Sequence, residues 1–212
     1  ITADSSGNNY QASLLSMSTS TNPIAGKVGQ AINFDGVTNK ITLLNTAVLP
    51  STMGTLAAWM KTANTTDSQR SAVSIASTAS ITPLIVLQFD SSADNGVSNC
   101  GPASVQKVKL VVRDDSLNTG VVCTTATLND GKWHHLVGTF DTATQSIYVD
   151  GVFIATVTTA LGAATFNEMG IGHRARATTE IFQAFPGSVD DVRVYNRRLS
   201  AAEVKMLYDS TR

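Results

Sequence analysis

Two adjacent histidines, His134 and His135, are the residues of this 212-residue chain that first suggest chemistry. They lie in a run that is typical of a β-strand, where successive side chains point to opposite faces, so the two imidazoles diverge. Trp133 shares a face with His135. No serine or cysteine in a nucleophile motif stands beside them, and a nucleophile–base pair is therefore not indicated.

Carboxylates are the other candidates, because glycoside hydrolysis needs two of them roughly 5–10 Å apart across the scissile bond. Asp114-Asp115 lies at a predicted turn, and the side chains of Asp190-Asp191 point to opposite faces of a strand. The chain has three glutamates and none lies in an alternating acidic cluster: Glu168, Glu180 and Glu203. We therefore expect a protein that is not an enzyme.

The two cysteines, Cys100 and Cys123, are predicted to form a disulfide. Such a bridge closes a loop of about 24 residues and is worth about 3 kcal/mol on the loop-entropy model. A hairpin turning at residues 116–117 places Cys123 opposite the region of Leu110, so the bridge requires residues 98–104 to fold back over the sheet. Two free buried thiols are the alternative, whereas zinc binding is not indicated by the spacing.

Short apolar or alternating runs between turn signals recur along most of the chain and predict strands. The runs are residues 31–34, 40–44, 55–61, 71–76, 84–89, 105–113, 121–127, 132–140, 145–149, 152–158, 169–173 and 188–195. So many strands with little helical periodicity predict two packed antiparallel sheets. Without an internal repeat or a linker, residues 1–212 are expected to form a single domain.

Local signals fix several turns and one helix. Asp150-Gly151 between two strand-like runs predicts a type I′ hairpin, because glycine tolerates the positive φ that this turn requires. Ser200 and Glu203 have the spacing of a capping box. They predict one short C-terminal helix that ends near Tyr208.

Composition argues against nucleic-acid binding and membrane insertion and favours a secreted or cell-surface protein. The net charge of −1 provides no field for nucleic acid or anionic lipid. No run of about 18 apolar residues exists that would insert into a membrane. The low charged fraction of 15% and the many serines and threonines suit a secreted or cell-surface protein. Because the chain begins with Ile1, we expect a processed or excised segment of a larger protein with neighbouring domains.

An ordered series of motifs resembles the LamG-like jelly-roll domains, which belong to the concanavalin A-like lectin/glucanase family. The motifs are DSSGN (4–8), GQAINFDG (29–36), TLAAW (55–59), DGKWHHLVGTFD (130–141), IYVDGV (147–152), GIGH (170–173), PGSVDDVRVYN (186–196) and LSAAEV (199–204). The resemblance covers nearly the whole chain, and residues 62–127 are the part where the family varies most.

The resemblance implies an all-β fold, a two-sheet antiparallel jelly-roll sandwich with one short C-terminal helix. It also implies interior positions for Trp59, Trp133 and His135, with His135 a hydrogen-bonded core residue. Members of the family are often adhesive or glycan-binding modules of extracellular proteins. The architecture also hosts hydrolases and spacers, so fold alone does not decide function.

The resemblance further implies one structural calcium ion, which prefers six to eight oxygen ligands from loops. Asp35 and Asp190 resemble positions that contribute to the ion site, Gly36 offers its carbonyl, and Asp4 is predicted to complete the cluster. The alternative is that Asp35 only caps a turn and that Asp191 pairs with a neighbouring arginine.

His173, Arg174 and Arg176 are the predicted ligand-binding residues, because two arginines on a loop can hold a carboxylated or sulfated sugar through paired hydrogen bonds. A solvated loop is the alternative. We therefore expect a non-catalytic adhesive or carbohydrate-binding module whose partner is a glycan or a host or matrix glycoprotein. A purely structural spacer or protein-interaction module is the second hypothesis.

Overall fold

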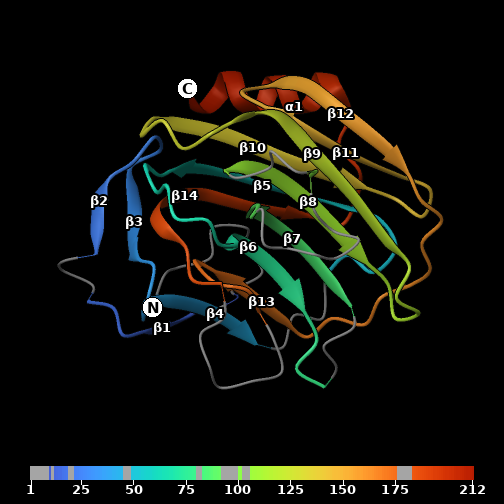
Figure 1. Ribbon diagram of the computed structural model, residues 1–212, viewed down its shortest axis with the longest axis horizontal. Helices are drawn as coiled ribbons and strands as arrows, with labels where there is room; N and C mark the ends of the chain where they lie inside the picture. Colours follow the sequence, from blue (N-terminus) through green and yellow to red (C-terminus); the bar gives the residue numbers. More distant parts are fainter. Residues whose placement is uncertain are drawn as a thin grey trace.

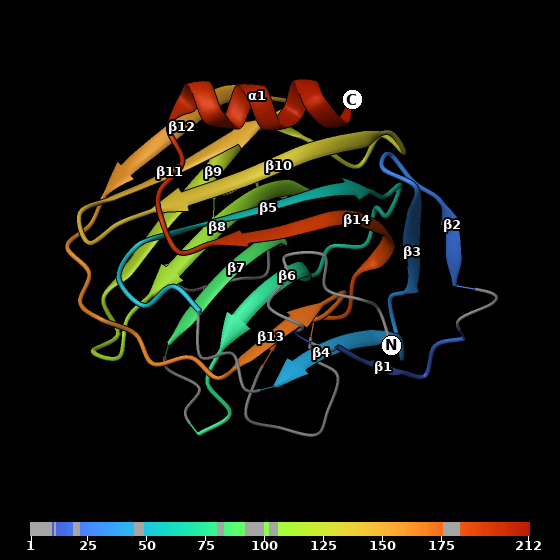
Figure 2. The ribbon, with the colours of Figure 1, turned by 180° about the vertical axis from the view of Figure 1, so that it is seen from behind.

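The computed structural model describes residues 10, 12–18, 22–44, 49–79, 83–91, 100–101, 106–175 and 183–212. Within them the chain forms two seven-stranded antiparallel sheets and one C-terminal helix. Figures 1 and 2 show the two sheets from opposite sides. The predicted two-sheet jelly-roll sandwich is confirmed.

The first sheet has the strand order β1-β4-β13-β6-β7-β8-β9. Its strands are β1 (Ser13–Leu15), β4 (Lys40–Leu44), β6 (Arg70–Ala76), β7 (Leu84–Phe89), β8 (Lys107–Arg113), β9 (Thr119–Thr127) and β13 (Glu168–Ile171). The second sheet has the order β12-β11-β10-β5-β14-β3-β2. Its strands are β2 (Pro23–Ala25), β3 (Gln30–Asp35), β5 (Gly54–Lys61), β10 (Trp133–Phe140), β11 (Thr144–Val149), β12 (Val152–Thr158) and β14 (Pro186–Tyr195).

The main core lies between the sheets, and strand alternation decides which side chains enter it. In β7, Ile85, Leu87 and Phe89 belong to this core, and Val86 belongs to a smaller cluster on the outer face of the first sheet. In β5 nearly every residue is buried, because both faces of the second sheet are covered at this strand. A continuous apolar run therefore replaces the alternation of a half-exposed strand.

Helix α1 (Ala201–Thr211) covers the outer face of the second sheet. Its capping box is formed as predicted, with the Ser200 amide donating to Glu203 Oε2 at 2.8 Å and the Glu203 amide donating to Ser200 Oγ at 3.3 Å. Val204 and Leu207 pack against that face, and both views place α1 alongside β10, β11 and β12. The helix ends three residues beyond the predicted Tyr208, at Thr211.

The predicted hairpin at Asp150-Gly151 joins β11 to β12. Asp150 and Gly151 both have positive φ, 51° and 77°, as a type I′ turn requires. In the described part of the chain, no helix is long and apolar enough to cross a membrane.

Candidate functional site

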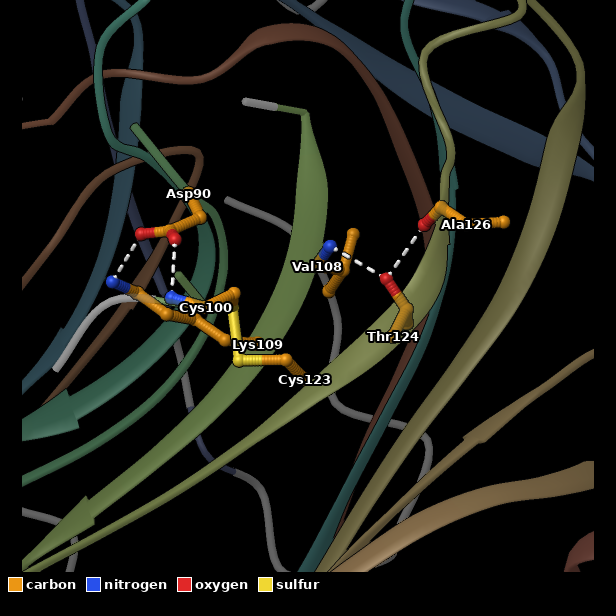
Figure 3. Close-up of a disulfide and its surroundings, with 7 residues drawn as sticks. All are labelled: Asp90, Cys100, Val108, Lys109, Cys123, Thr124 and Ala126. Carbon is orange, nitrogen blue, oxygen red and sulfur yellow. Dashed lines mark hydrogen bonds and ion pairs between the residues drawn. A yellow bond between two sulfur atoms is a disulfide. The ribbon is translucent and has the colours of Figure 1, made fainter. Parts of the chain in front are cut away.

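The disulfide between Cys100 and Cys123 is formed, with a Cα–Cα distance of 5.8 Å. Cys123 lies on β9 opposite Lys109 of β8, one residue from the predicted neighbour Leu110. The register is regular from the Arg113–Thr119 pair to the Lys109–Cys123 pair, so the offset arises in the turn, where Leu117 has a φ of 70°. Val122 points into the core between the sheets, so Cys123 points to the outer face of the first sheet and holds Cys100 there. Figure 3 shows the bond between the two cysteines.

A buried ion pair lies beside the disulfide (Figure 3). Lys109 Nζ is 2.5 Å from Asp90 Oδ1, and both side chains are 0% exposed. The Cys100 amide donates to Asp90 Oδ2 at 2.7 Å. The sequence did not predict this pair, because the alternating run of β8 resembles an ordinary strand whose lysines face solvent.

His173 is buried, with 3% of its surface exposed, and is not placed to contact a surface ligand. Its Nε2 lies 3.3 Å from the Thr42 hydroxyl and its Nδ1 lies 3.1 Å from the Arg174 carbonyl oxygen. The ring occupies the space that a side chain at Gly170 would fill. Burial lowers the pKa of His173 to about 4, so the imidazole is neutral at pH 7. The prediction of a ligand-contacting His173 is therefore corrected.

Of the two arginines that were predicted to bind a ligand beside His173, only Arg174 lies in the described part of the chain. Arg174 is half-buried and takes part in interactions within the protein, so it is not a free loop cation. Arg176 lies outside the described residues. Their role in holding an acidic sugar stays a prediction.

Asp35 caps its own turn, as the alternative interpretation expected. Its carboxylate accepts hydrogen bonds from the amides of Val37, Thr38 and Asn39 and from the Thr38 hydroxyl. Burial alone raises the pKa of Asp35, but these hydrogen bonds outweigh it and hold the pKa well below its usual range. The backbone of the next residue, Gly36, has a φ of 74° that suits glycine.

Asp190 instead holds the turn between β2 and β3. Its Oδ2 accepts the amides of Lys27 and Val28 at 2.7 and 2.8 Å, and its Oδ1 accepts the Asp191 amide at 2.7 Å. Asp191 has a φ of 46° at a β-bulge and pairs with Arg193 at 2.9 Å, as the alternative interpretation expected.

The predicted sharing of one ion by Asp35 and Asp190 does not fit this geometry. Asp35 pairs with Pro186 across β3 and β14, and Asp190 lies four residues farther along β14. At about 3.3 Å per residue the two positions are roughly 13 Å apart, too far for their short side chains to reach one calcium ion. Asp4 lies outside the described residues, which contain no group of three metal-ligating side chains.

His135 is completely buried between the second sheet and α1, as expected. The expected hydrogen bond of its ring is not found in the described part of the chain. Among the described residues neither ring nitrogen has a hydrogen-bond partner, and the ring lies 5.2 Å from that of Trp59 and 6.1 Å from that of Tyr208. Burial lowers the pKa of His135 to about 4. Trp59 is buried as expected and donates from Nε1 to Thr211, whereas Trp133 is only half-buried.

His134 points away from His135 and lies between two carboxylates. Its Nδ1 is 2.9 Å from Asp150 Oδ2 and its Nε2 is 3.2 Å from Asp130 Oδ1. The hydrogen bond with Asp150 raises the pKa of His134 against the effect of burial, and Asp130 adds to the increase. The pair of histidines is therefore structural, with each imidazole committed to a different face.

A shallow hollow opens at the end of the sandwich near the β8–β9 turn. We call it the end hollow. Buried apolar side chains form its floor: Ile85, Val112, Phe140 and Leu161. Polar and smaller groups and one half-buried aromatic ring form the rest of the lining: Ser51, Thr52, Arg113, Asp114, Gly162, Ala164 and Phe166.

Hydrogen bonds make the rim of the end hollow rigid. The Asp114 carboxylate accepts the amides of Ser116, Asn118 and Gly162, and the Ala164 amide donates to the Ser51 carbonyl at 3.0 Å. An apolar floor with a few fixed polar groups is the usual composition of a small-molecule site. Sequence reasoning missed this hollow because its residues come from segments far apart in the chain.

Two seven-stranded antiparallel sheets with one C-terminal helix define the class as a jelly-roll β-sandwich. The chain belongs to the concanavalin A-like lectin/glucanases superfamily, whose family model matches residues 35–205. No curated protein sequence matches the chain.

Solved structures share the fold at low sequence identity. The binding domain of Paraclostridial Mosquitocidal Protein 1 has a TM-score of 0.73 and 15% identity over 98% of this chain and 49% of that chain. A structure of botulinum neurotoxin type C, whose cell entry depends on two ganglioside molecules, has a TM-score of 0.70 and 11% identity over 99% and 48%. The chain thus spans about half the length of these toxin structures.

Another match is domain 4 of AbnA, an extracellular arabinanase from Geobacillus stearothermophilus, solved in complex with arabinotriose. Its TM-score is 0.61 at 18% identity, over 88% of this chain and 80% of that chain. At these identities the likeness establishes the fold alone.

Proposed function

We propose that this domain is a non-catalytic carbohydrate-binding module of an extracellular protein. The disulfide supports an oxidising compartment, since such bonds are rare in the cytosol. The related toxin and arabinanase domains are described as a binding domain and as a complex with an oligosaccharide. A glycan or glycoprotein partner and neighbouring domains belong to the same proposal.

The end hollow is the observation that supports the proposal, because its lining offers both an apolar surface and hydrogen-bonding groups, and a sugar needs both. The C–H face of a pyranose or furanose ring packs on aromatic groups, and the half-buried ring of Phe166 is the aromatic group available here. The ring hydroxyls meet hydrogen-bonding groups at the rim, which Ser51, Thr52 and Arg113 provide.

A glycan array with neutral and acidic oligosaccharides tests this function. The wild-type protein is expected to bind a subset of the array. Thr52→Trp fills the end hollow and is expected to reduce that binding at least 10-fold, equivalent to about 1.4 kcal/mol or more. Thr127→Trp adds the same ring at an exposed residue at the end of β9 and is the matched control, with unchanged binding expected.

The outcomes separate the two hypotheses. Silence of the wild-type protein across neutral and acidic glycans contradicts the proposal and favours the structural spacer. Glycan binding that survives Thr52→Trp keeps the function and rejects the end hollow as its site.

Calcium binding is a separate proposal that rests on the family resemblance. The positions of Asp35 and Asp190 do not fit one shared ion, so no contact with calcium is assigned to them. Melting curves with EDTA and with added Ca²⁺ test the ion directly. We expect a higher melting temperature in calcium; identical curves, together with no calcium by elemental analysis, would reject the ion.

A further inference from the structure

The ion pair of Lys109 and Asp90 is unusual in its burial. Both side chains are 0% exposed, although they lie on the outer face of the first sheet. Removing both charges from water has a large desolvation cost, which attraction between the charges offsets only in part. If the amine and the carboxylate react with each other, both charges disappear and the desolvation cost disappears with them.

The distances place the reacting groups together. Lys109 Nζ lies 2.5 Å from Asp90 Oδ1, close enough for direct proton transfer. Lys109 and Asp90 are held from neighbouring strands, because β8 pairs with β7 and the Asp90 amide donates to the Lys107 carbonyl at 2.8 Å. Well-oriented groups within one molecule react as if at effective concentrations of about 10⁵–10⁸ M.

The other oxygen of the Asp90 carboxylate, Oδ2, accepts a hydrogen bond from a backbone amide. The Cys100 backbone amide donates to Asp90 Oδ2 at 2.7 Å, and the disulfide to Cys123 anchors that amide. A fixed backbone N–H aimed at an oxygen stabilises negative charge that develops on it during acyl transfer. Figure 3 shows the amine and the amide on the two oxygens of one carboxylate.

We propose that Lys109 and Asp90 condense into an isopeptide bond that cross-links the start of β8 to the end of β7. Lys109 Nζ first transfers a proton to Asp90 Oδ1, which gives a neutral amine and a carboxylic acid. The amine lone pair then attacks Cγ, a C–N bond forms, and the C=O electron pair moves to Oδ2, where the Cys100 amide stabilises it.

The intermediate then collapses to the amide. The electron pair returns from Oδ2 to form the C=O bond, the Cγ–Oδ1 bond breaks, and Oδ1 leaves as water with a second proton from Nζ. One ammonium and one carboxylate thus give one amide and one water, and no oxidant or reductant is consumed. The inference is independent of the glycan-binding proposal.

The chain contains a natural control for the role of burial. Lys205 Nζ and Asp209 Oδ2 on α1 are also 2.5 Å apart, but their side chains are 51% and 39% exposed. Water solvates both charges there, and no backbone amide is recorded on the Asp209 carboxylate among the described contacts. This pair is expected to remain an ion pair.

Intact-mass spectrometry of the folded, purified chain tests the proposal. The protein is denatured and fully reduced before measurement, so that the disulfide contributes no mass difference. The wild-type chain is expected to be lighter than its sequence by one water molecule. Lys109→Arg keeps the positive charge but removes the primary amine, and it is expected to have the full sequence mass.

Peptide mapping then locates the loss. The expected result is a branched peptide that joins the Asp90 segment to the Lys109 segment, with the Lys205 and Asp209 peptides at full mass. A reduced wild-type chain with the full sequence mass would overturn the proposal, and so would a missing water that maps to any other residues. The wild-type result decides the matter even where Lys109→Arg does not fold.

Discussion

The outer faces of the two sheets both carry side chains that water does not reach, but they are held by different forces. On the second sheet, Val204 and Leu207 of α1 cover Val137 and Tyr148 in a mainly apolar contact. On the first sheet, the disulfide and an ion pair with 0% exposure lie on the outer side. Apolar packing tolerates small losses of contact, whereas a buried charge depends strongly on the opposite charge beside it.

The largest loss of stability is expected from replacing one residue of the buried pair on the first sheet. Lys109→Met leaves the Asp90 carboxylate buried without the lysine that pairs with it or forms the proposed amide, and is expected to cost about 3–5 kcal/mol in the free energy of unfolding. Urea denaturation followed by tryptophan fluorescence measures it.

Lys205→Met removes the same charge from the exposed pair with Asp209 and is the control. Because exposed pairs contribute little, a change of at most about 0.5–1 kcal/mol is expected. Equal effects of the two substitutions would show that burial of the first pair has no energetic consequence.

The pH dependence of stability tests the contact between α1 and the second sheet, because His135 is buried in it. Its pKa is lowered to about 4 in the folded protein by burial, against 6.5 for the free side chain. Between pH 6.5 and 4 the unfolded state therefore binds the proton and the folded state does not, so stability falls as the pH falls. The full penalty, present below pH 4, is about 3 kcal/mol.

Denaturation of the wild-type protein and of His135→Phe between pH 7 and 4 isolates this contribution. The difference in unfolding free energy between them is expected to shift in favour of His135→Phe as the pH falls. A difference that does not vary with pH would mean that His135 is not held neutral. His134 has the opposite sign, because its raised pKa adds stability at low pH that is lost as the pH rises.

The smallest expected effect concerns the helix contact. Leu207→Ala removes apolar contact between α1 and the second sheet and is expected to cost about 2 kcal/mol, the low end for a leucine at the edge of a cluster. Met206→Ala changes the exposed side of the same helix and is the control, with almost no effect. A loss for Leu207→Ala no larger than for the control would show that α1 is only loosely attached.

The local features of the fold were predictable because neighbouring residues determine them. Asp150-Gly151 carries its own turn geometry, and Ser200 and Glu203 form their cap within one helical turn. The two-sheet sandwich also followed from the alternation of apolar residues. Even the disulfide was predictable, since the chain has only two cysteines.

The site was much less predictable, because it depends on how distant strands are placed. The burial of His173 depends on Thr42 of another strand as well as on Gly170 of its own segment. Asp35 and Asp190 belong to conspicuous motifs, yet the register of β3 on β14 separates them. The end hollow has no motif at all, since its rim joins residues near 52, 113 and 162.

Nuclear magnetic resonance titration tests the glycan-binding site most directly. The titrant is the oligosaccharide that binds most strongly on the array, and the readout is the set of backbone amide signals that shift. The shifts are expected to centre on Thr52, Arg113 and Gly162 at the end hollow. Shifts centred on the outer face of either sheet, or no shifts at a saturating concentration, would contradict the proposed site.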